Sequence, residues 1–341
     1  MFLSYYCYVL FLPLLLISSL IIFISSSWIS MWMIMEINLI SFICLMIFDK
    51  NLKMNMSFNY FLIQSMNSYL FLIGSIFLNF NSYYIFMMML FIMNFSMLMK
   101  LSIFPFHMWY INIMKSMNWM NIMLMSTTQK IIPLFCLNNI INIMNNNMFM
   151  FYMNMFIILI SSFFSTLMGM MQNLLKILMS YSSMIHMSWI IMLMFFNEMM
   201  MMNYFIIYSI ISFSMYFMFY KFNINNLLDL NFLKFNKNYY YYFFMTMMMC
   251  MAGSPPLFGF MMKWISIQSM YTMSFFYIFI LIINSLMSMY FYYQIMFSSL
   301  MNNMMSMKMN FKKMNYYNNM NFKMILMNWF LVILLIIYEI I

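Results

Sequence analysis

Hydrophobic residues run through this chain in long stretches, and polar residues gather in the short links between them. A helix needs about 20 mostly apolar residues to cross a bilayer, and eleven stretches approach or exceed that length. They cover residues 8–26, 28–48, 58–78, 83–104, 118–137, 149–168, 178–196, 200–220, 239–264, 271–297 and 323–341. The pattern predicts an all-α membrane protein in which residues 1–341 form a single transmembrane bundle.

The fourth and ninth predicted spans share an unusual pair of features, a lysine and a nearby proline. Lys100 precedes Pro105 by five residues, and Lys263 follows Pro255 and Pro256 by eight and seven. An offset of five spans predicts two five-helix halves, residues 1–140 and 141–300, each with a broken fourth helix. Because five is odd, the halves have opposite orientations in the membrane. Residues 323–341 then form an additional C-terminal helix.

The composition agrees with a membrane bundle. Of the 341 residues, 67% are hydrophobic and only 6% are charged, with a mean hydropathy of +0.92. A soluble domain carries about 25% charged residues. The net charge of +9 does not indicate nucleic-acid binding, because the lysines are scattered over short links without a basic groove.

Residue usage indicates where the gene resides. The chain has 60 Met, 42 Phe and 26 Tyr but only 4 Gly, and it has no arginine. The favoured residues have A/U-rich codons, and the excess of methionine fits a code in which AUA reads as methionine. Both observations predict an AT-rich mitochondrial genome and the mitochondrial inner membrane. Residues 8–26 are too long for a signal-peptide core and lack a basic flank, so we expect no cleavable presequence.

The lysines outside the spans predict the orientation of the bundle. They lie on even-numbered links or at their edges: Lys50, Lys53, Lys115, Lys176, Lys221, Lys234, Lys237, Lys308, Lys312, Lys313 and Lys323. The odd-numbered links carry no lysine. By the positive-inside rule, the N-terminus and the even links face the matrix. The C-terminus faces the intermembrane space.

Four charged residues fall inside predicted spans: Glu36, Lys100, Lys130 and Lys263. A charge near the bilayer centre costs roughly 2.5–3.5 kcal/mol and usually marks an ion or proton path. Burial favours a neutral lysine, whereas a carboxylate partner favours a charged one. A lysine that alternates between being buried alone and being paired with a carboxylate changes its proton affinity. A proton pump requires such a change. The alternatives to a role in a proton path are that the lysine side chains extend to the membrane–water interface and that Glu36 is only hydrogen-bonded in the core.

Prolines accompany the three lysines, since Pro133 also follows Lys130 by three residues. A proline inside a span frees backbone carbonyls, which must then be satisfied by water, side chains or a neighbouring helix. Broken helices beside intramembrane charges are typical of transporters. We therefore expect a hydrated half-helix end next to each titratable amine.

Other polar side chains are candidate proton relays. Ser182, His186 and Trp189 share one face of the seventh span, and Thr127 lies beside Lys130. An imidazole titrates near neutrality, which suits His186 for proton transfer.

His107 follows Pro105 at an expected matrix-side helix end and is a further candidate. Gln64, Asn67 and Ser68 share a face of the third span. The alternative role for all these polar groups is hydrogen bonding between helices.

Several kinds of site are not supported by the sequence. Cys7, Cys44, Cys136 and Cys250 stand alone without a C-x-x-C pair, so neither an iron–sulfur cluster nor a zinc site is indicated. The two histidines are too few to support a b-type haem protein, and no G-x-G-x-x-G motif indicates dinucleotide binding. We predict no cofactor-binding and no metal site in this chain.

Four segments carry a resemblance to a known family. They are MEINLISFI (Met35–Ile43), KLSIFPFHMWYINIMKSMNWMNIMLMSTTQKIIP (Lys100–Pro133), MSYSSMIHMSW (Met179–Trp189) and AGSPPLFGFMMKW (Ala252–Trp264). In this order they resemble the mitochondrial NADH dehydrogenase subunit 2 family, antiporter-like membrane subunits of respiratory complex I. The animal members of that family have eleven spans.

The resemblance implies roles for the buried charges. Glu36 and Lys100 correspond to the family's Glu–Lys pair, Lys130 to its central lysine, and Lys263 to its distal lysine. The implied function is proton translocation along this axis, coupled to electron transfer from NADH to ubiquinone. NADH, FMN, iron–sulfur clusters and ubiquinone would be bound by other subunits. The implied partners are neighbouring antiporter-like and small hydrophobic subunits and the lipid bilayer, without nucleic acid.

The chain departs from the family pattern at a few positions. Lys176 and Ile177 stand where an Arg-Lys pair is usual, and Ser188 and Ser254 replace common glycines. Two other functions remain open, a structural scaffold of the membrane arm and an independent cation/proton antiporter. Subunits 4 and 5 of the same complex are related alternatives to subunit 2. They are disfavoured because they are longer and have extra spans, and because this chain has no H-x-E-A-P segment.

Overall fold

The computed structural model describes residues 2–49, 54–78, 82–144, 147–231, 238–255, 257–271 and 275–309. Over these ranges the chain forms α-helices, two short 3-10 helices and a single isolated β-bridge between Leu174 and Asn226. The prediction of an all-α fold is confirmed.

The α-helices, in chain order, are α1 (Phe2–Ile21), α2 (Trp28–Ile47), α3 (Met54–Phe77), α4 (Tyr83–Lys100), α5 (Met108–Ser116), α6 (Trp119–Ser126), α7 (Thr128–Met144), α8 (Met148–Met170), α9 (Leu175–Met194), α10 (Glu198–Phe222), α12 (Asn238–Ala252), α13 (Phe258–Ser269) and α14 (Phe275–Met309). The 3-10 helices are η1 (Ile22–Ile24) and η2 (Leu227–Asn231).

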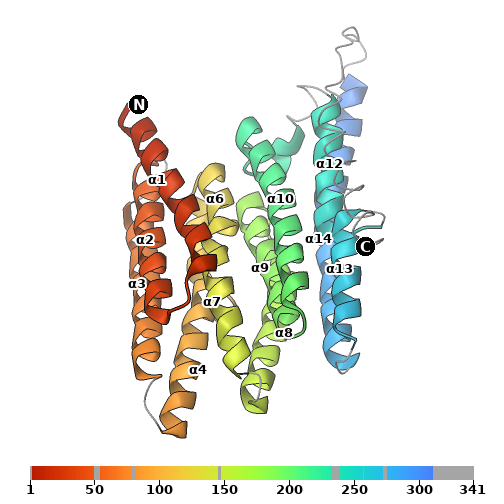
Figure 1. Cartoon of the computed structure of the whole chain (residues 1–341). Coiled ribbons are helices and arrows are strands. Elements are labelled where there is room, and N and C mark those ends of the chain that lie inside the picture. The colour runs from red at the N-terminus through yellow and green to blue at the C-terminus, as the bar shows by residue number, and fades with distance from the viewer. Residues whose placement is uncertain are drawn as a thin grey trace.

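The helices run roughly along one direction, with α8 to α10 between α1 to α7 and α12 to α14 (Figure 1), and we divide them by chain order into two groups. Helices α1 to α7 make the first group, in which α2 packs against α1 and α3, and α4 packs against α3 and α7. Helices α8 to α14 make the second group, in which α14 packs against α8 and α12. The two groups meet where α10 packs against α6 and where α9 packs against α5 and α7.

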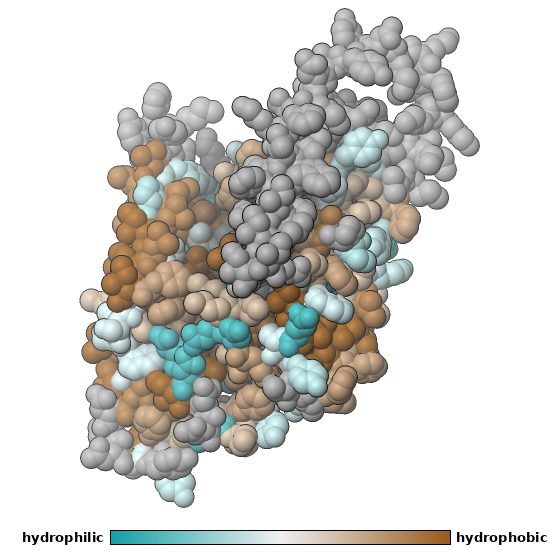
Figure 2. All heavy atoms as spheres, turned by 45° about the vertical axis from the view of Figure 1, so that its right-hand side comes forward, coloured by the Kyte–Doolittle hydropathy of each residue, from teal (hydrophilic) through white to brown (hydrophobic). Residues whose placement is uncertain are grey.

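Within the described residues, six helices are long and apolar enough to cross a membrane. They are Trp28–Ile47, Met54–Phe77, Met148–Met170, Leu175–Met194, Glu198–Phe222 and Phe275–Ser298. Large apolar side chains such as Leu20, Phe213 and Phe279 are exposed on the outside of the bundle, and brown hydrophobic side chains form broad areas of the coloured part of the face in Figure 2. Because lipid rather than water can cover such a surface, the fold is that of a membrane protein.

Helix α9 is the interior helix of the bundle. All its residues except Lys176 are buried. A helix that is hydrophobic all round and buried on every side occupies the core, so the polar side chains of α9 face other helices and not lipid.

The fourth predicted span is broken, as expected, but its far end was predicted wrongly. Helix α4 ends at Lys100, and α5 begins only at Met108 and continues to Ser116. The predicted span 83–104 therefore stops inside the break. The sequence predicted that the fourth span ends near Pro105. The chain instead resumes a helix after the proline, and that helix ends at Ser116.

The fifth predicted span contains a break that the sequence did not place correctly. Helices α6 and α7 separate at Thr127, whereas Pro133 lies inside α7. The hydroxyls of Thr127 and Thr128 donate to the carbonyls of Met123 and Leu124 at 2.7 and 2.8 Å, which satisfies the end of α6. Pro133 is the sixth residue of α7 and lacks the N–H that would donate to the carbonyl of Gln129, yet the helix continues through it.

The ninth predicted span is broken where the sequence predicts it, between α12 and α13. Gly253 follows α12 with a φ of +81°, a conformation that favours glycine. The α12 and α13 backbones then approach so closely that a Cβ on Gly259 would lie 1.6 Å from the carbonyl oxygen of Cys250.

The tenth predicted span corresponds to α14, which is longer than predicted. The eleventh, residues 323–341, lies outside the described residues, as do Lys50, Lys53, Lys234, Lys237, Lys312, Lys313 and Lys323.

Candidate functional site

Lys100 is the last residue of α4, and its side chain is buried. Its Nζ lies 3.3 Å from the sulfur of Met35 on α2. The amine therefore points into the bundle and does not extend to the membrane interface. The C-terminal end of α4 carries a partial negative charge, which favours an ammonium group there.

Glu36 lies in the middle of α2 and is half-buried. Its carboxylate is hydrogen-bonded to the hydroxyl of Ser68 on α3. Glu36 is within electrostatic reach of Lys100, but no direct ion pair joins the two in the part of the chain that the structure describes. The structure thus brings the predicted pair into one neighbourhood, with Met35 in contact with the amine.

Lys130, in the first turn of α7, is 3% exposed. Its Nζ has no hydrogen-bond partner among the described residues. The nitrogen lies 5.1 Å from the centroid of the Tyr110 ring, within the range of a cation–π interaction. A buried amine with all three donor positions open is costly unless it is hydrated or neutral.

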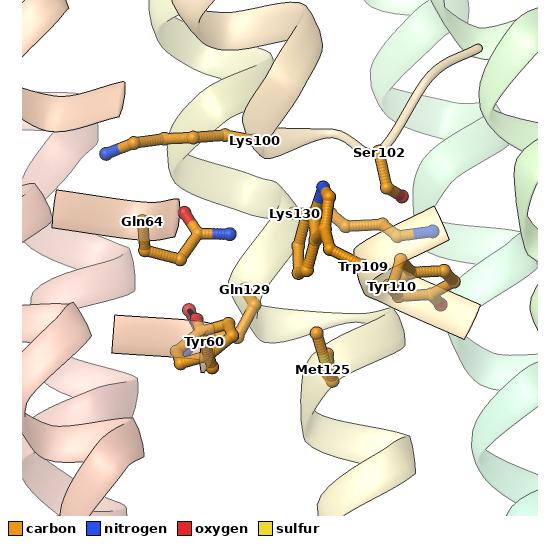
Figure 3. A pocket seen from close by; sticks show the side chains of 9 residues that line it. All are labelled: Tyr60, Gln64, Lys100, Ser102, Trp109, Tyr110, Met125, Gln129 and Lys130. Atoms are coloured by element: carbon orange, nitrogen blue, oxygen red, sulfur yellow. Dashed lines mark hydrogen bonds between the residues drawn. The ribbon is translucent and has the colours of Figure 1, made fainter. Parts of the chain in front are cut away.

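A small cavity lies between Lys100 and Lys130. It has a volume of about 20 Å³, and it is lined by Tyr60, Gln64, Lys100, Ser102, Trp109, Tyr110, Met125, Gln129 and Lys130. A polar cavity of this size has room for a water molecule. Figure 3 shows that the Lys100 side chain extends toward α2 and α3, whereas Lys130 extends toward Tyr110.

Hydrogen bonds fix the wall of this cavity. Gln129 on α7 donates to Asn38 on α2 at 2.6 Å, and the Tyr60 hydroxyl on α3 donates to Gln129 at 3.2 Å. Three helices are thereby tied together beside the two lysines. A second space of about 20 Å³ next to these residues is lined by Met35, Asn38, Lys100 and Gln129, among others.

Lys263 lies on α13, and its side chain is buried. Its Nζ donates to the carbonyl oxygen of Ala252, the last residue of α12, at 3.0 Å. Lys100 and Lys263 therefore repeat one arrangement, because each is associated with the C-terminal end of the first part of a broken helix. That end favours a cation in both cases.

The candidate relay residues differ in their surroundings. His186 is buried on α9, its Nδ1 lies 3.1 Å from the Tyr204 hydroxyl, and it is within electrostatic reach of both Lys130 and Lys263. Ser182 and Thr127 donate to carbonyls of their own helices. His186 is thus the relay candidate that lies between the two lysines.

His107 does not occupy the matrix-side helix end that the sequence predicted. It precedes α5 inside the break, where its ring stacks on Phe104 with centroids 5.4 Å apart and meets Phe164 edge to face. It is absent from the residues that line the two spaces described above.

The sequence did not single out two aromatic side chains at the cavity, Tyr60 and Tyr110. Among 26 tyrosines neither is marked by a motif, and only the fold brings their side chains to the cavity that the two lysines line. Tyr110 shares a hydrogen bond of 2.9 Å with Ser183 on α9.

Lys176 belongs to a separate polar cluster at the ends of several helices. Its Nζ donates to the carbonyl oxygen of Met117 at 2.8 Å and lies 5.8 Å from the centroid of the Trp119 ring. Asp49 accepts hydrogen bonds from Asn118 and Asn121 nearby. The Lys176 side chain reaches from α9 to the C-terminal end of α5, where it satisfies the free carbonyl of Met117. Lys176 thereby connects α9 to the end of the broken fourth span.

Over the described ranges, no group of three or more His, Cys, Asp or Glu side chains is close enough to hold a metal ion. The site is therefore defined by lysines, a carboxylate and neutral hydrogen-bonding groups.

An all-helical membrane bundle with broken helices beside buried lysines defines an antiporter-like membrane protein. A family model described as NADH:quinone oxidoreductase/Mrp antiporter, transmembrane, matches residues 25–288. The NADH-ubiquinone oxidoreductase chain 2 of Anopheles gambiae is 32% identical over 328 residues, which are 92% of this chain and 91% of the relative. The chain belongs to the NADH:quinone oxidoreductase/Mrp antiporter family and, within it, to the chain 2 proteins of NADH-ubiquinone oxidoreductase.

Solved structures share the fold at low sequence identity. A chain of the membrane-bound sulfane sulfur reductase, an archaeal respiratory membrane complex, superposes with a TM-score of 0.81 at 13% identity, covering 97% of this chain and 73% of that chain. A chain of respiratory complex I from Thermus thermophilus gives a TM-score of 0.76 at 16% identity, covering 86% and 70%.

Proposed function

We propose that this chain is a proton-translocating membrane subunit of mitochondrial NADH:ubiquinone oxidoreductase, respiratory complex I. The observation that carries the proposal is the cavity shared by Lys100 and Lys130, together with a third buried lysine at the second helix break. Family membership supplies the complex, since the relative from Anopheles gambiae is named a chain of NADH-ubiquinone oxidoreductase.

In the proposed mechanism, protons move between groups of this chain alone. A change in a neighbouring subunit shifts the balance between Glu36 and Lys100. Lys100 then exchanges a proton with Lys130 through the cavity, and Lys263 supplies or drains the far half of the path. A proton transfer between two lysines breaks one N–H bond and forms another, and a transfer between a lysine and water exchanges an N–H bond for an O–H bond. No redox chemistry is therefore required of this chain.

Electron transfer from NADH to ubiquinone would take place elsewhere. We propose that NADH, FMN, iron–sulfur clusters and ubiquinone are bound by other subunits, and that this chain contacts neighbouring antiporter-like and small hydrophobic subunits. The shared fold with membrane complexes supports a place among partner subunits.

The proposed architecture has eleven spans in two inverted halves. Breaks after α4 and α12, each with a lysine at the end of the half-helix, support the repeat. The halves divide between α7 and α8, close to residue 140, and residues 323–341 add the C-terminal helix. The N-terminus and the even links face the matrix in this arrangement, and the C-terminus faces the intermembrane space.

The experiment that tests the proposal replaces Lys130 by methionine. Methionine keeps an unbranched apolar side chain but removes the titratable amine. We expect proton translocation per NADH oxidised, measured in closed vesicles, to fall several-fold while a native gel shows normal assembly. Lys221→Met, at the exposed end of α10, is the matched control and should pump normally.

Unchanged pumping in an assembled Lys130→Met complex would contradict the proposal and favour the scaffold function. An independent cation/proton antiporter makes a different prediction, because it would exchange cations for protons in vesicles that lack the rest of the complex.

A further inference from the structure

Four buried tyrosines meet in the interior of the bundle, and we refer to them as the tyrosine cluster. Tyr110 lies on α5, Tyr208 and Tyr216 lie on α10, and Tyr292 lies on α14. Each side chain is at most 1% exposed. The phenol of Tyr208 interacts electrostatically with the phenols of the other three, so the four rings form one group and not isolated core residues.

Most of these hydroxyls lack a hydrogen-bond partner. In the described part of the chain, the hydroxyls of Tyr208, Tyr216 and Tyr292 are buried without one. Buried polar groups in native proteins are nearly always hydrogen-bonded to protein or to ordered water. Three such phenols near one another therefore form a polar region inside an apolar bundle.

Serine side chains complete this region. Ser183 lies near Tyr208, Ser126 near Tyr216 and Ser182 near Tyr292, although none of these pairs has the geometry of a hydrogen bond. Each serine hydroxyl donates to a carbonyl of its own helix. The serine oxygens keep lone pairs that can accept from a phenol or a water molecule.

Rings of the tyrosine cluster face Lys130 on one side and His186 on the other. On one side, the Nζ of Lys130 lies 5.1 Å from the centroid of the Tyr110 ring. On the other, the ring of Tyr208 lies 5.0 Å from that of His186, which is within electrostatic reach of Lys263. Because α5 belongs to the first group of helices and α10 and α14 to the second, the tyrosine cluster crosses from one group to the other.

We infer that the tyrosine cluster relays protons between Lys130 and His186, and through His186 to Lys263. This inference rests on the proposed function. It assigns the groups that join the two halves of the proposed proton path. A phenol is both donor and acceptor. Its oxygen accepts a proton from one neighbour while its own O–H proton passes to the next, so one O–H bond forms, one breaks, and the ring stays neutral. Lys130 loses the proton that His186 gains.

Tyrosine rings could instead serve only to pack the helices, and a hydroxyl-specific variant separates these roles. Phenylalanine keeps the ring and removes the oxygen. The test variant combines Tyr208→Phe, Tyr216→Phe and Tyr292→Phe. The matched control is Tyr241→Phe, which makes the same change at a buried position on α12 outside the tyrosine cluster.

The measurement is the number of protons translocated per NADH oxidised by the complete complex in closed vesicles, after a native gel has shown assembly. We expect the triple variant to pump several-fold less than the Tyr241→Phe control and the single Tyr208→Phe variant to be intermediate. If the triple variant does not assemble, Tyr208→Phe alone decides, and normal pumping by it overturns the relay.

Lys130→Met is measured in parallel to separate two kinds of failure. Normal pumping by the tyrosine variants together with impaired Lys130→Met overturns the relay and leaves the proposed function intact. Normal pumping by all of them overturns both. Impaired tyrosine variants with normal Lys130→Met also overturn the relay, because its path begins at Lys130.

Discussion

Each buried lysine is held in the bundle by a different contact. Lys100 touches a sulfur, Lys130 faces an aromatic ring, and Lys263 donates to a backbone carbonyl. None of the three Nζ atoms has a carboxylate within direct ion-pair distance in the described residues. A proton on any of them is therefore stabilised by weak and adjustable contacts, which is the property that a carrier group needs.

At the residue scale, the sequence predicted which charges are buried but not what surrounds them. Lys100, Lys130 and Lys263 were evident because charge is rare in such a chain. Tyr60, Tyr110 and the rest of the tyrosine cluster could not be predicted, since tyrosine is frequent here and its burial depends on contacts between distant helices. The cavity between Lys100 and Lys130 is likewise a product of packing.

A glycine at the second helix break provides a prediction at this scale. A Cβ on Gly259 would lie 1.6 Å from the carbonyl oxygen of Cys250, so Gly259→Ala forces α12 and α13 apart. We expect a loss of more than about 3 kcal/mol of stability, beyond the usual range for overpacking. The complex should be scarce on a native gel and should melt earlier.

Gly169→Ala is the control for this prediction. Its Cβ would meet Phe291 and Tyr181 at ordinary distances of 3.5 Å, and alanine favours a helix over glycine by about 1 kcal/mol. Normal or raised stability is expected there. Equal stability of the Gly259→Ala and Gly169→Ala complexes would contradict the close approach of the two backbones at Gly259.

At the element scale, proline was a good guide to the presence of a break and a poor guide to its position. Pro105 and Pro255 lie in breaks, whereas Pro133 lies inside α7 and the break occurs at Thr127. The helix continues through Pro133 although the proline cannot make the helical N–H hydrogen bond at that position. Threonine hydroxyls that satisfy the end of α6 give no clear signal in the sequence.

The orientation of α8 in the membrane is a prediction that can be measured directly. Met148 and Met171 stand at opposite ends of this helix and are 70% and 77% exposed. The lysine distribution predicts that Met171 lies on a matrix-facing link. With cysteine at either position in a background lacking the native thiols, an impermeant thiol reagent on the matrix side should label Met171→Cys and spare Met148→Cys. The reverse labelling would contradict the orientation.

At the scale of the whole molecule, two groups of helices meet where α10 packs against α6 and the buried helix α9 packs against α5 and α7. The fold class was predictable because long apolar stretches permit little else in a membrane. The meeting of α5, α7, α9 and α10 was not predictable, because pairing between distant helices leaves little trace in a sequence so rich in methionine and phenylalanine. That meeting brings Lys130, His186 and Lys263 into one electrostatic neighbourhood.

The central claim is that Lys130 and Lys263 serve a single proton path. A double-mutant cycle tests it most directly, with Lys130→Met, Lys263→Met and the double variant compared by protons translocated per NADH in closed vesicles. Groups that act as a unit have non-additive effects. We predict that each single variant impairs pumping several-fold and that the double variant is no worse than the more impaired single. Effects that multiply, or single variants that pump normally in an assembled complex, would contradict one shared path.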